Sequence, residues 1–299
     1  MILLTGATGL IGSALLRRLL DSGQEVRCLV RDPRRLGPNR VRVQITLGDL
    51  ADPVSLRQAV RGVSTVVHLA AAIRDQPGGS IEELNGLATA RLLREAKQAG
   101  VDRFVFFSAL NASPTSRTRF FRAKALAEQA VLEAEVEAAV FAPSIVYAPG
   151  DSWLTLLGRM TLLPWIPLAG SGRAPFQPIW AEDVAACVAS ALSTAVTGRR
   201  RFELAGPDVM TYEDMVRVAL ELEGRRRPLI HVPLGVVRRG LGALERVAGG
   251  STFATWEEAE LMEEPMITPR GPEDARKLGV EPKPMRAVLG LTGAAQPAR

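Results

Sequence analysis

The sequence is poor in the residue types on which metal sites, disulfide scaffolds and membrane spans depend. Among 299 residues there are two cysteines, two histidines and two tyrosines. Cys28 and Cys187 lie in apolar stretches without metal-site spacing, so we expect no metal and buried thiols in a reducing compartment. No window of about 18 apolar residues is free of charges and prolines, which argues against a membrane-spanning helix. Because an apolar strand and a glycine turn start at residue 1, we expect no signal peptide and a cytoplasmic location.

Lysine is also scarce, and arginine carries most of the positive charge. Lysine and arginine together number 37 against 32 acidic residues, for a formal net charge of +5, and only four of the 37 are lysines. The arginines gather in short runs at 31–35, 199–201 and 225–227, with acidic segments elsewhere. We interpret these runs as solvated faces or anion contacts. A nucleic-acid surface would need a continuous stripe or a recognisable module, so we expect no nucleic-acid partner.

Apolar runs and helical periods alternate through the first half of the chain. We expect strands at 1–5, 25–30, 41–47, 65–69, 103–107 and 138–142, and helices at 10–20, 53–60, 81–98 and 119–134. This alternation predicts an α/β fold, a Rossmann doubly wound parallel sheet with helices on both faces. The hydrophobic content of 47% is ample for such a core.

The first strand runs directly into a glycine-rich turn. The turn reads Thr5-Gly6-Ala7-Thr8-Gly9-Leu10-Ile11-Gly12. A glycine triplet between a strand and a helix is the fingerprint of a dinucleotide site. We expect Gly6 to allow a tight turn, Gly9 to let the backbone approach a pyrophosphate, and Gly12 to let the helix pack closely. The predicted cofactor contacts in this turn are Thr5, Gly6, Thr8, Gly9, Leu10, Ile11 and Gly12. The alternative is a glycine turn that holds no ligand.

The pattern changes after residue 150, where a smaller C-terminal substrate domain is expected. Residues 151–178 contain prolines, glycines and tryptophans in irregular order. A helix at 182–193, a strand at 201–204, a helix at 212–223 and two helical segments from 233 follow. We predict a nucleotide-binding domain over 1–150, with 176–206 returning to it. The smaller domain would then comprise 151–175 and 207–299.

Later motifs follow in an order that resembles the extended and atypical branches of the short-chain dehydrogenase/reductase superfamily. They are Gly48-Asp49-Leu50, His68-Leu69-Ala70-Ala71, Asn85-x-x-x-Thr89, Ser108, Pro143-Ser144-Ile145 and Ile179–Val184. The resemblance implies cofactor contacts at Asp49, Leu50, Leu69, Ala70, Ala71, Asn85, Pro143, Ser144 and Ile145. The segment that begins at Pro233 is similar to the branch that includes the nucleotide-binding accessory subunit of respiratory complex I.

The roles of three polar residues stay open at this point. Ser108 is either a hydroxyl of the active-site pocket or a turn residue. Asn85 either binds water in the pocket or caps a helix N-terminus. His68 lies either beside the cofactor or in the core with its ring nitrogens bonded.

The end of the second strand bears on the choice between NADP and NAD. Members that bind NAD place an acid there for the ribose 2′-hydroxyl. Here Arg31 comes first, and a guanidinium group suits a 2′-phosphate. We therefore predict NADP, with contacts from Arg31 and Arg35. Asp32 keeps NAD as the alternative cofactor, and a surface ion pair is the alternative role of Arg31.

The resemblance implies a Tyr-x-x-x-Lys pair on one helix face, and only the lysine is present. Phe120 stands four residues before Lys124, where the tyrosine is expected. In that pair the ammonium group lowers the tyrosine pKa, and the phenol exchanges a proton with the substrate. A phenyl ring has no such proton, and neither Tyr147 nor Tyr212 is followed by lysine four residues later. Lys124 and Ser108 remain the candidate catalytic residues, with Lys124 as a ribose contact or else a surface lysine.

Three functional hypotheses remain. The first is an NADP-dependent reductase of an apolar carbonyl substrate. The second is an inactive nucleotide-binding protein, structural or redox-sensing, that docks on a larger respiratory-type assembly. The third is a peripheral membrane protein in which the apolar and arginine-bearing segment 233–248 lies on an anionic surface; its alternative is a helix packed on the smaller domain.

Overall fold

The computed structural model describes residues 1–194, 200–240 and 255–291. Its strands are β1 (Ile2–Thr5), β2 (Val26–Val30), β3 (Gln44–Leu47), β4 (Thr65–His68), β5 (Arg103–Phe107), β6 (Glu137–Pro143), β7 (Val146–Tyr147), β8 (Ile166–Ala169), β9 (Pro175–Phe176), β10 (Ile179–Trp180), β11 (Arg200–Leu204), β12 (Met210–Thr211) and β13 (Leu229–Val232). Its helices are α1 (Leu10–Asp21), α2 (Pro53–Ala59), α3 (Ala88–Gln98), α4 (Arg119–Glu133), α5 (Ser152–Met160), α6 (Ala181–Ser193), α7 (Tyr212–Leu222), α9 (Trp256–Leu261), α10 (Glu273–Lys277) and α11 (Met285–Val288), with a 3₁₀ helix η1 (Pro33–Val41) and a π-helix η2 (Glu83–Leu87).

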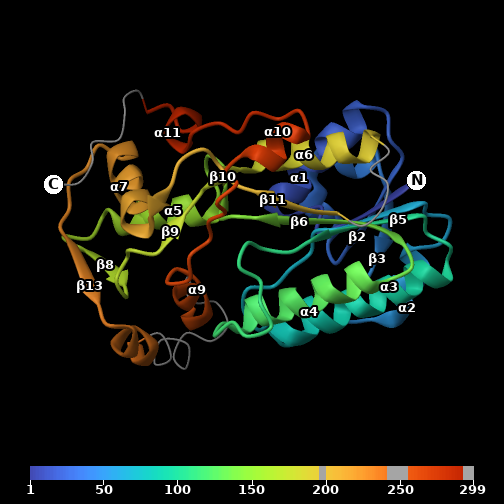
Figure 1. Cartoon of the computed structure of the whole chain (residues 1–299), viewed down its shortest axis with the longest axis horizontal. Coiled ribbons are helices and arrows are strands. Elements are labelled where there is room, and N and C mark those ends of the chain that lie inside the picture. Colours follow the sequence, from blue (N-terminus) through green and yellow to red (C-terminus); the bar gives the residue numbers. More distant parts are fainter. Residues whose placement is uncertain (195–199, 241–254, 292–299) are drawn as a thin grey trace.

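A seven-stranded parallel sheet forms the centre of the fold, as the alternating pattern predicts. Its strand order is β11-β6-β5-β4-β1-β2-β3, and every neighbouring pair is parallel. Helices α1, α6 and α10 lie on one face, and α2, α3 and α4 lie on the other (Figure 1). The strand order reverses between β1 and β4, and in doubly wound sheets this switch point is where ligands bind.

Two apolar clusters hold the helices on the two faces of this sheet. Residues of β1, α1 and α6 share one cluster, and residues of β5, α3 and α4 share the other. The apolar period of α1 places Leu15, Leu16 and Leu19 on its buried face. At the start of α2, Asp52 accepts hydrogen bonds from the amides of Val54 and Ser55, so this acid caps the helix.

The second half of the chain is more regular than its composition indicates. The segment 151–178, for which sequence analysis assigns no helix or strand, contains α5, β8 and β9. Strands β7, β8 and β9 pair with β10, β13 and β12, which lie far from them in sequence. Such short strands have little periodicity of their own and depend on these distant partners. The predicted strand at 41–47 begins only at Gln44, because η1 takes up Pro33–Val41.

A third apolar cluster joins the elements around α5 and α7. It includes Tyr147, Phe176 and Met215, and Phe120 and Trp180 pack against it. The segment after α9 crosses back toward the large sheet, where Ala275 and Leu278 join the cluster under α1 and α6. Within the described ranges, no helix has the length and apolar character to cross a bilayer.

Candidate functional site

The glycine turn lies at the switch point of the sheet, between the end of β1 and the start of α1. Gly6 has a φ of +76°, which favours glycine, and a Cβ on it would lie 2.6 Å from the Ala70 amide nitrogen. A Cβ on Gly12 would lie only 2.0 Å from the Gly6 carbonyl oxygen. Gly12 therefore packs α1 against the turn itself, a closer neighbour than the sheet. These two glycines let the first turn of α1 and the end of β4 lie against the same loop.

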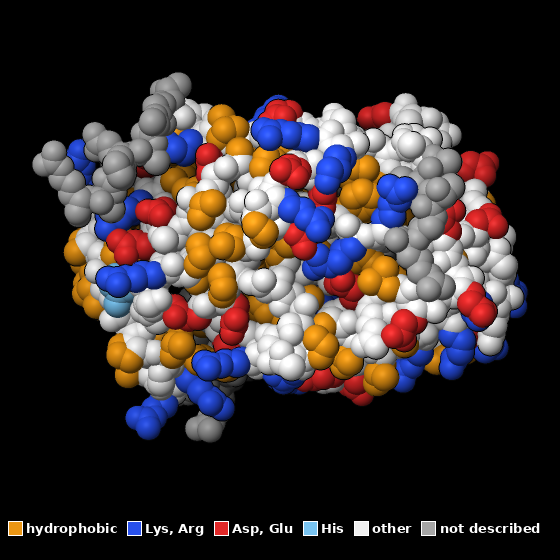
Figure 2. All heavy atoms as spheres, viewed as in Figure 1, with side chains coloured by type: hydrophobic (Ala, Val, Ile, Leu, Met, Phe, Trp, Pro, Cys, Tyr) orange, Lys and Arg blue, Asp and Glu red, His pale blue; other side chains and the backbone are white. Residues whose placement is uncertain are grey.

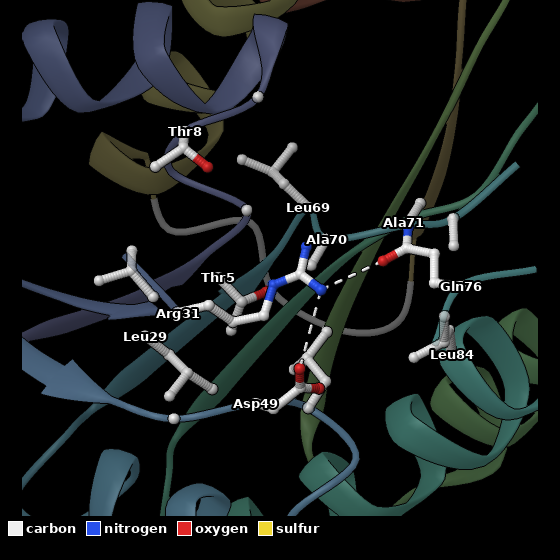
Figure 3. Close-up of a pocket in the computed structure, with 16 residues that line it drawn as sticks. Thr5, Thr8, Leu29, Arg31, Asp49, Leu69, Ala70, Ala71, Gln76 and Leu84 are labelled. Carbon is white, nitrogen blue, oxygen red and sulfur yellow. Dashed lines mark hydrogen bonds and ion pairs between the residues drawn. The ribbon is translucent and has the colours of Figure 1, made fainter. Parts of the chain in front are cut away.

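A cavity of about 270 Å³ opens beside this turn. Ten of its lining residues are predicted cofactor contacts: Thr5, Gly6, Thr8, Gly9, Arg31, Asp49, Leu50, Leu69, Ala70 and Ala71. Six others line it without having been predicted: Leu29, Val30, Gly48, Ala72, Gln76 and Leu84. Figure 3 shows Thr8 at one end of the group and Asp49 at the other, with Arg31 between them. The site thus gathers the ends of β1, β2, β3 and β4.

Of the residues that line the cavity, Gln76 and Leu84 are the ones that sequence analysis misses most clearly. They belong to the segment between β4 and α3, which folds back over the cavity. A Gln76–Gly79 bridge closes a small turn in this segment, and the Asp75 carboxylate accepts a hydrogen bond from the Ile81 amide. No motif marks these residues, so the sequence has no signal from which they could be found.

Arg31 spans the cavity between two of its walls. Its Nη1 donates a 3.1 Å hydrogen bond to Gln76 Oε1 and lies 3.8 Å from Asp49 Oδ2 (Figure 3). The alternative of a surface ion pair is therefore partly correct, since the Arg31 side chain is 61% exposed. Asp32 takes a different place: its Oδ1 accepts hydrogen bonds from the Arg34 amide and Nε, and it caps η1. Arg35 lies on η1, exposed and outside the cavity lining.

The residues at the phosphate end fit a dinucleotide. The N-cap of α1 is Gly9, no side chain caps this helix, and its first turn has no acidic residue. The first-turn amides of α1, those of Leu10, Ile11 and Gly12, therefore have no capping side chain to compete with an anion. The positive end of the helix dipole favours phosphate at that place. At the other end of the cavity, Leu29, Leu50 and Leu84 offer apolar wall to an aromatic base.

A buried chain of hydrogen bonds joins the ends of β1 and β4, which line the cavity, to α3. His68 Nδ1 lies 2.7 Å from Thr5 Oγ1, and its Nε2 lies 3.0 Å from Thr89 Oγ1. Thr89 donates its single hydroxyl proton to the Asn85 carbonyl, so His68 Nε2 carries the proton and Nδ1 accepts from Thr5. Burial, with the Lys124 charge as a smaller cause, lowers the His68 pKa to about 3. His68 is thus a neutral core histidine, which was the alternative to a place beside the cofactor.

Asn85 holds the loop that follows β4. Its side-chain amide donates to the carbonyls of Ala72 and Ile81, and its Oδ1 accepts from the Ala72 amide. Asn85 is 1% exposed and lies inside η2, so the expectation that it caps a helix N-terminus is wrong. The Asn-x-x-x-Thr motif therefore links the cavity wall at Ala72 to His68 and the Thr5 end of β1.

Lys124 is buried in the sheet-facing side of α4, at 2% exposure, so the surface alternative is wrong. Its Nζ donates a 2.7 Å hydrogen bond to the Phe107 carbonyl and lies 4.9 Å from the centre of the Phe106 ring. Burial lowers its pKa to about 7, against a smaller opposite effect of Glu128. The Phe120 ring centre lies 5.8 Å away, where a tyrosine would otherwise accompany the lysine.

Two buried hydroxyls have no hydrogen-bond partner among the described residues. They are Ser108 Oγ, directly after β5, and the Tyr147 hydroxyl on β7. The turn or cap role of Ser108 is not seen, because its hydroxyl bonds to no backbone group. Burial raises the pKa of Tyr147, so its phenol holds its proton. An unpaired buried hydroxyl is costly to the fold, which makes both groups candidates for ligand contact.

The segment after β6 bonds to the C-terminal half of the chain. Ser144 Oγ donates to the Met266 carbonyl at 2.7 Å and accepts from the Gln177 amide at 3.1 Å. The Pro143 carbonyl accepts a hydrogen bond from the Leu110 amide. Ten predicted site residues lie outside the cavity lining: Leu10, Ile11, Gly12, Arg35, Asn85, Ser108, Lys124, Pro143, Ser144 and Ile145. The structure thus brings ten of the predicted site residues together in one cavity and leaves the other ten outside its lining.

Across the described ranges, no group of three or more His, Cys, Asp or Glu side chains could hold a metal ion. Cys28 and Cys187 are buried free thiols, and burial raises the pKa of both to about 12.

Comparison with known proteins identifies a family, several relatives and a solved structure to which this chain is similar. Residues 6–146 match the NAD(P)H-binding family. The chain is 30% identical over 230 residues to the mitochondrial NADH dehydrogenase [ubiquinone] 1 alpha subcomplex subunit 9 of Arabidopsis thaliana, a match that covers 73% of this chain and 56% of that subunit. It is 30% identical over 238 residues to the ceramide reductase of Caulobacter vibrioides, covering 78% and 74%. The crystal structure of gox2253 superposes with a TM-score of 0.73 at 25% identity, covering 97% of this chain and 95% of that one.

Proposed function

Since the chain belongs to the extended and atypical branches of the short-chain dehydrogenase/reductase superfamily and has an NAD(P)-binding Rossmann fold, we propose that it binds NADP(H) in preference to NAD(H). The observation that carries this preference is the placement of Arg31 and Asp32. Arg31 lines the cavity where the 2′-position of an adenosine ribose would lie, and the Asp32 carboxylate caps η1 instead. An acid at the end of β2 would favour a free 2′-hydroxyl, and a guanidinium group there favours a phosphate. The carboxylate of Asp49, on the next segment of the cavity wall, lies 3.8 Å from Arg31 and offsets part of its charge.

We further propose that the protein holds its nucleotide without the usual proton transfer. A bound nicotinamide would supply a hydride, but the Tyr-x-x-x-Lys relay ends at Phe120. Lys124 donates its hydrogen bond to the Phe107 carbonyl, and its low pKa leaves it only partly charged near pH 7. The bound nucleotide would then act as a structural ligand, which stabilises the fold by mass action.

A reductase is the second candidate, and the two unpaired hydroxyls favour it. Ser108 Oγ and the Tyr147 hydroxyl are buried without a partner in the part of the chain that the structure describes, so either could polarise a carbonyl oxygen of an apolar substrate. The surroundings suit such a substrate, because Phe120, Trp180 and Ile145 pack against the same apolar cluster as Tyr147. The ceramide reductase relative is also named for reduction of a lipid, which is consistent with an apolar substrate.

Calorimetry with NADPH and NADH tests the cofactor preference. We expect the nucleotide-free protein to bind NADPH more tightly than NADH, and Arg31→Gln to weaken NADPH binding by about ten- to a hundredfold, the range of a charge-assisted bond. Arg34→Gln is the matched control, because Arg34 lies on the same segment and bonds to Asp32, outside the cavity lining. Equal affinity for both nucleotides, unchanged in Arg31→Gln, would contradict the proposal.

Turnover separates the structural role from the reductase. We expect the wild type to oxidise NADPH slowly or not at all against a panel of apolar aldehydes and ketones, and Phe120→Tyr to gain activity. Rapid turnover by the wild type that Tyr147→Phe abolishes would favour the reductase and reject the structural role.

The remaining partner and location proposals rest on the relatives and on the thiols. The Arabidopsis relative is named as a subunit of NADH dehydrogenase, so we propose docking on a larger assembly as the context of the structural role. We propose the cytoplasm as the compartment, with support from the two buried free thiols.

A further inference from the structure

An exposed apolar loop lies at the far end of the molecule from the nucleotide cavity. Residues 162–165, Leu-Leu-Pro-Trp, follow α5 and precede β8. Leu162 is 64% exposed, and Leu163 and Trp165 are each 45% exposed. Figure 1 places β8 and β13, the strands beside this loop, at the end of the molecule away from α2 and α3. Adjacent exposed apolar side chains of this size usually mark an interaction surface.

Arginines surround this loop because β8 and β13 are parallel. Both strands begin at the same end of their sheet, with Ile166 in register with Leu229, so the residues before each strand are neighbours. Arg225–Arg227 therefore lie beside the apolar loop, and Arg225 Nη1 donates a 2.9 Å hydrogen bond to Thr161 Oγ1. Arg159 lies at the end of α5, where its carbonyl accepts from the Leu162 amide. We call Arg159, Leu162–Trp165 and Arg225–Arg227 the arginine–leucine tip.

The positive charge of the arginine–leucine tip is not neutralised within the parts of the chain that the structure describes. None of its four arginines forms an ion pair there, although Arg225 and Arg227 bond to a hydroxyl and a carbonyl. The acids of the neighbouring helix α7 have other partners: Glu213 pairs with Arg217 and His231, and Glu221 pairs with Arg286. Glu223, beside Gly158, forms no ion pair among the described residues and is the acid nearest in sequence to Arg225. The tip therefore keeps an excess of positive charge.

We infer that the arginine–leucine tip docks on the surface of an anionic lipid bilayer. The two leucines and Trp165 would enter the interfacial region, where tryptophan is favoured, and the arginines would contact lipid phosphates. The loop connects the end of α5 to the start of β8, and its apolar side chains are exposed to solvent. Side chains exposed in this way can enter the surface of a bilayer. In Figure 2, orange, blue and red side chains lie next to one another at this end of the molecule. Each arginine near an anionic bilayer contributes attraction that salt screens.

This surface differs from the segment first expected to touch a membrane. Residues 233–240 of that segment follow β13 and include a helix over 234–240, and residues 241–248 lie outside the described residues. The tip is formed instead at the opposite end of β13, from two segments that the pairing of β8 with β13 and the packing of α5 on α7 bring together. The inference concerns a surface remote from the nucleotide cavity and does not depend on the proposed function.

Vesicle flotation of the full chain tests the inference. We expect the protein to float with vesicles of phosphatidylcholine and phosphatidylglycerol in a 3:1 ratio, and not with pure phosphatidylcholine. Leu162→Gln combined with Leu163→Gln, and separately Arg159→Gln combined with Arg226→Gln, should each weaken binding by at least about tenfold. The control pair is Leu126→Gln with Arg61→Gln, an exposed apolar side chain on α4 and an exposed arginine elsewhere.

We would measure the thermal unfolding and the NADPH binding of every variant. A variant that keeps both but no longer floats has lost docking and not its fold. Flotation that the tip variants lose and the control pair keeps supports the inference, as does its loss in about 0.5 M salt. Absence of flotation with the anionic vesicles at low salt would overturn it. Flotation that the tip variants retain would also overturn it. Self-association that the tip variants abolish, without flotation, would identify the tip as a protein contact instead and reject the bilayer.

Discussion

Replacing the buried Lys124 with methionine should remove a pH dependence that the lysine confers on stability. In the folded protein burial lowers the pKa of Lys124 to about 7, whereas in the unfolded chain it has its ordinary value of 10.5. Between these two values the unfolded state binds the proton and the folded state does not, so the free energy of unfolding rises with pH. The destabilising effect of the lysine is therefore largest below pH 7 and fades as the pH approaches 10.5.

The expected size follows from the same two pKa values. From pH 7 to 8.5 the wild type should gain roughly 2 kcal/mol of unfolding free energy relative to Lys124→Met. Cys28 and Cys187 begin to ionise in the unfolded state near the top of this range, but they do so equally in both proteins and cancel in the difference. Methionine keeps most of the apolar stem, although it loses the 2.7 Å bond to the Phe107 carbonyl.

Urea denaturation of the nucleotide-free protein at several pH values measures this difference. We expect the curves of wild type and Lys124→Met to converge as the pH rises, with the variant the more stable at pH 7. Parallel curves would show that Lys124 titrates as an exposed lysine does, and the placement of its ammonium group beside Phe106 and Phe107 would then be wrong. Lys97→Met, at an exposed position on α3, is the matched control for replacing a lysine by methionine.

Two further changes test the support of the nucleotide turn. Gly12→Ala places a methyl group 2.0 Å from the Gly6 carbonyl oxygen, so we expect the free energy of unfolding to fall by about 1–3 kcal/mol and NADPH to bind more weakly. Calorimetry measures both, and the control is Gly235→Ala, at a helical glycine with open space around it, which should be neutral or stabilising. A Gly12→Ala protein as stable as wild type would contradict the close packing of α1 on the turn. Because His68 stays neutral in the fold, it makes the free energy of unfolding rise between about pH 3 and pH 6.5, and His68→Gln should remove this contribution. If the free energy of unfolding of the two proteins changed equally with pH over this range, His68 would be protonated in the fold as it is in the unfolded chain.

Much of the nucleotide half could be predicted from the sequence because its signals are local. A glycine triplet between an apolar strand and a helix involves only residues that are close in sequence. At Gly6 and Gly12 the structure leaves no room for a Cβ, as the triplet predicts. Alternation of strand and helix likewise predicts the parallel sheet, and Asp52 before Pro53 predicts the start of α2. The absence of the catalytic tyrosine is also visible from spacing alone, because Phe120 and Lys124 share a helix face.

Contacts between distant segments were decided only in the tertiary structure. Gln76 reaches Arg31 because the segment after β4 folds back over the cavity, and no periodic pattern records that path. Lys124 could be a surface residue or a ribose contact by sequence, and its burial against the Phe107 carbonyl depends on how α4 packs on β5. The arginines before β13 and the leucines before β8 are separated by more than sixty residues of chain, and a two-stranded parallel pairing brings them together. Local sequence determines backbone geometry within a few residues, whereas side-chain partners across the fold depend on the packing of the whole chain.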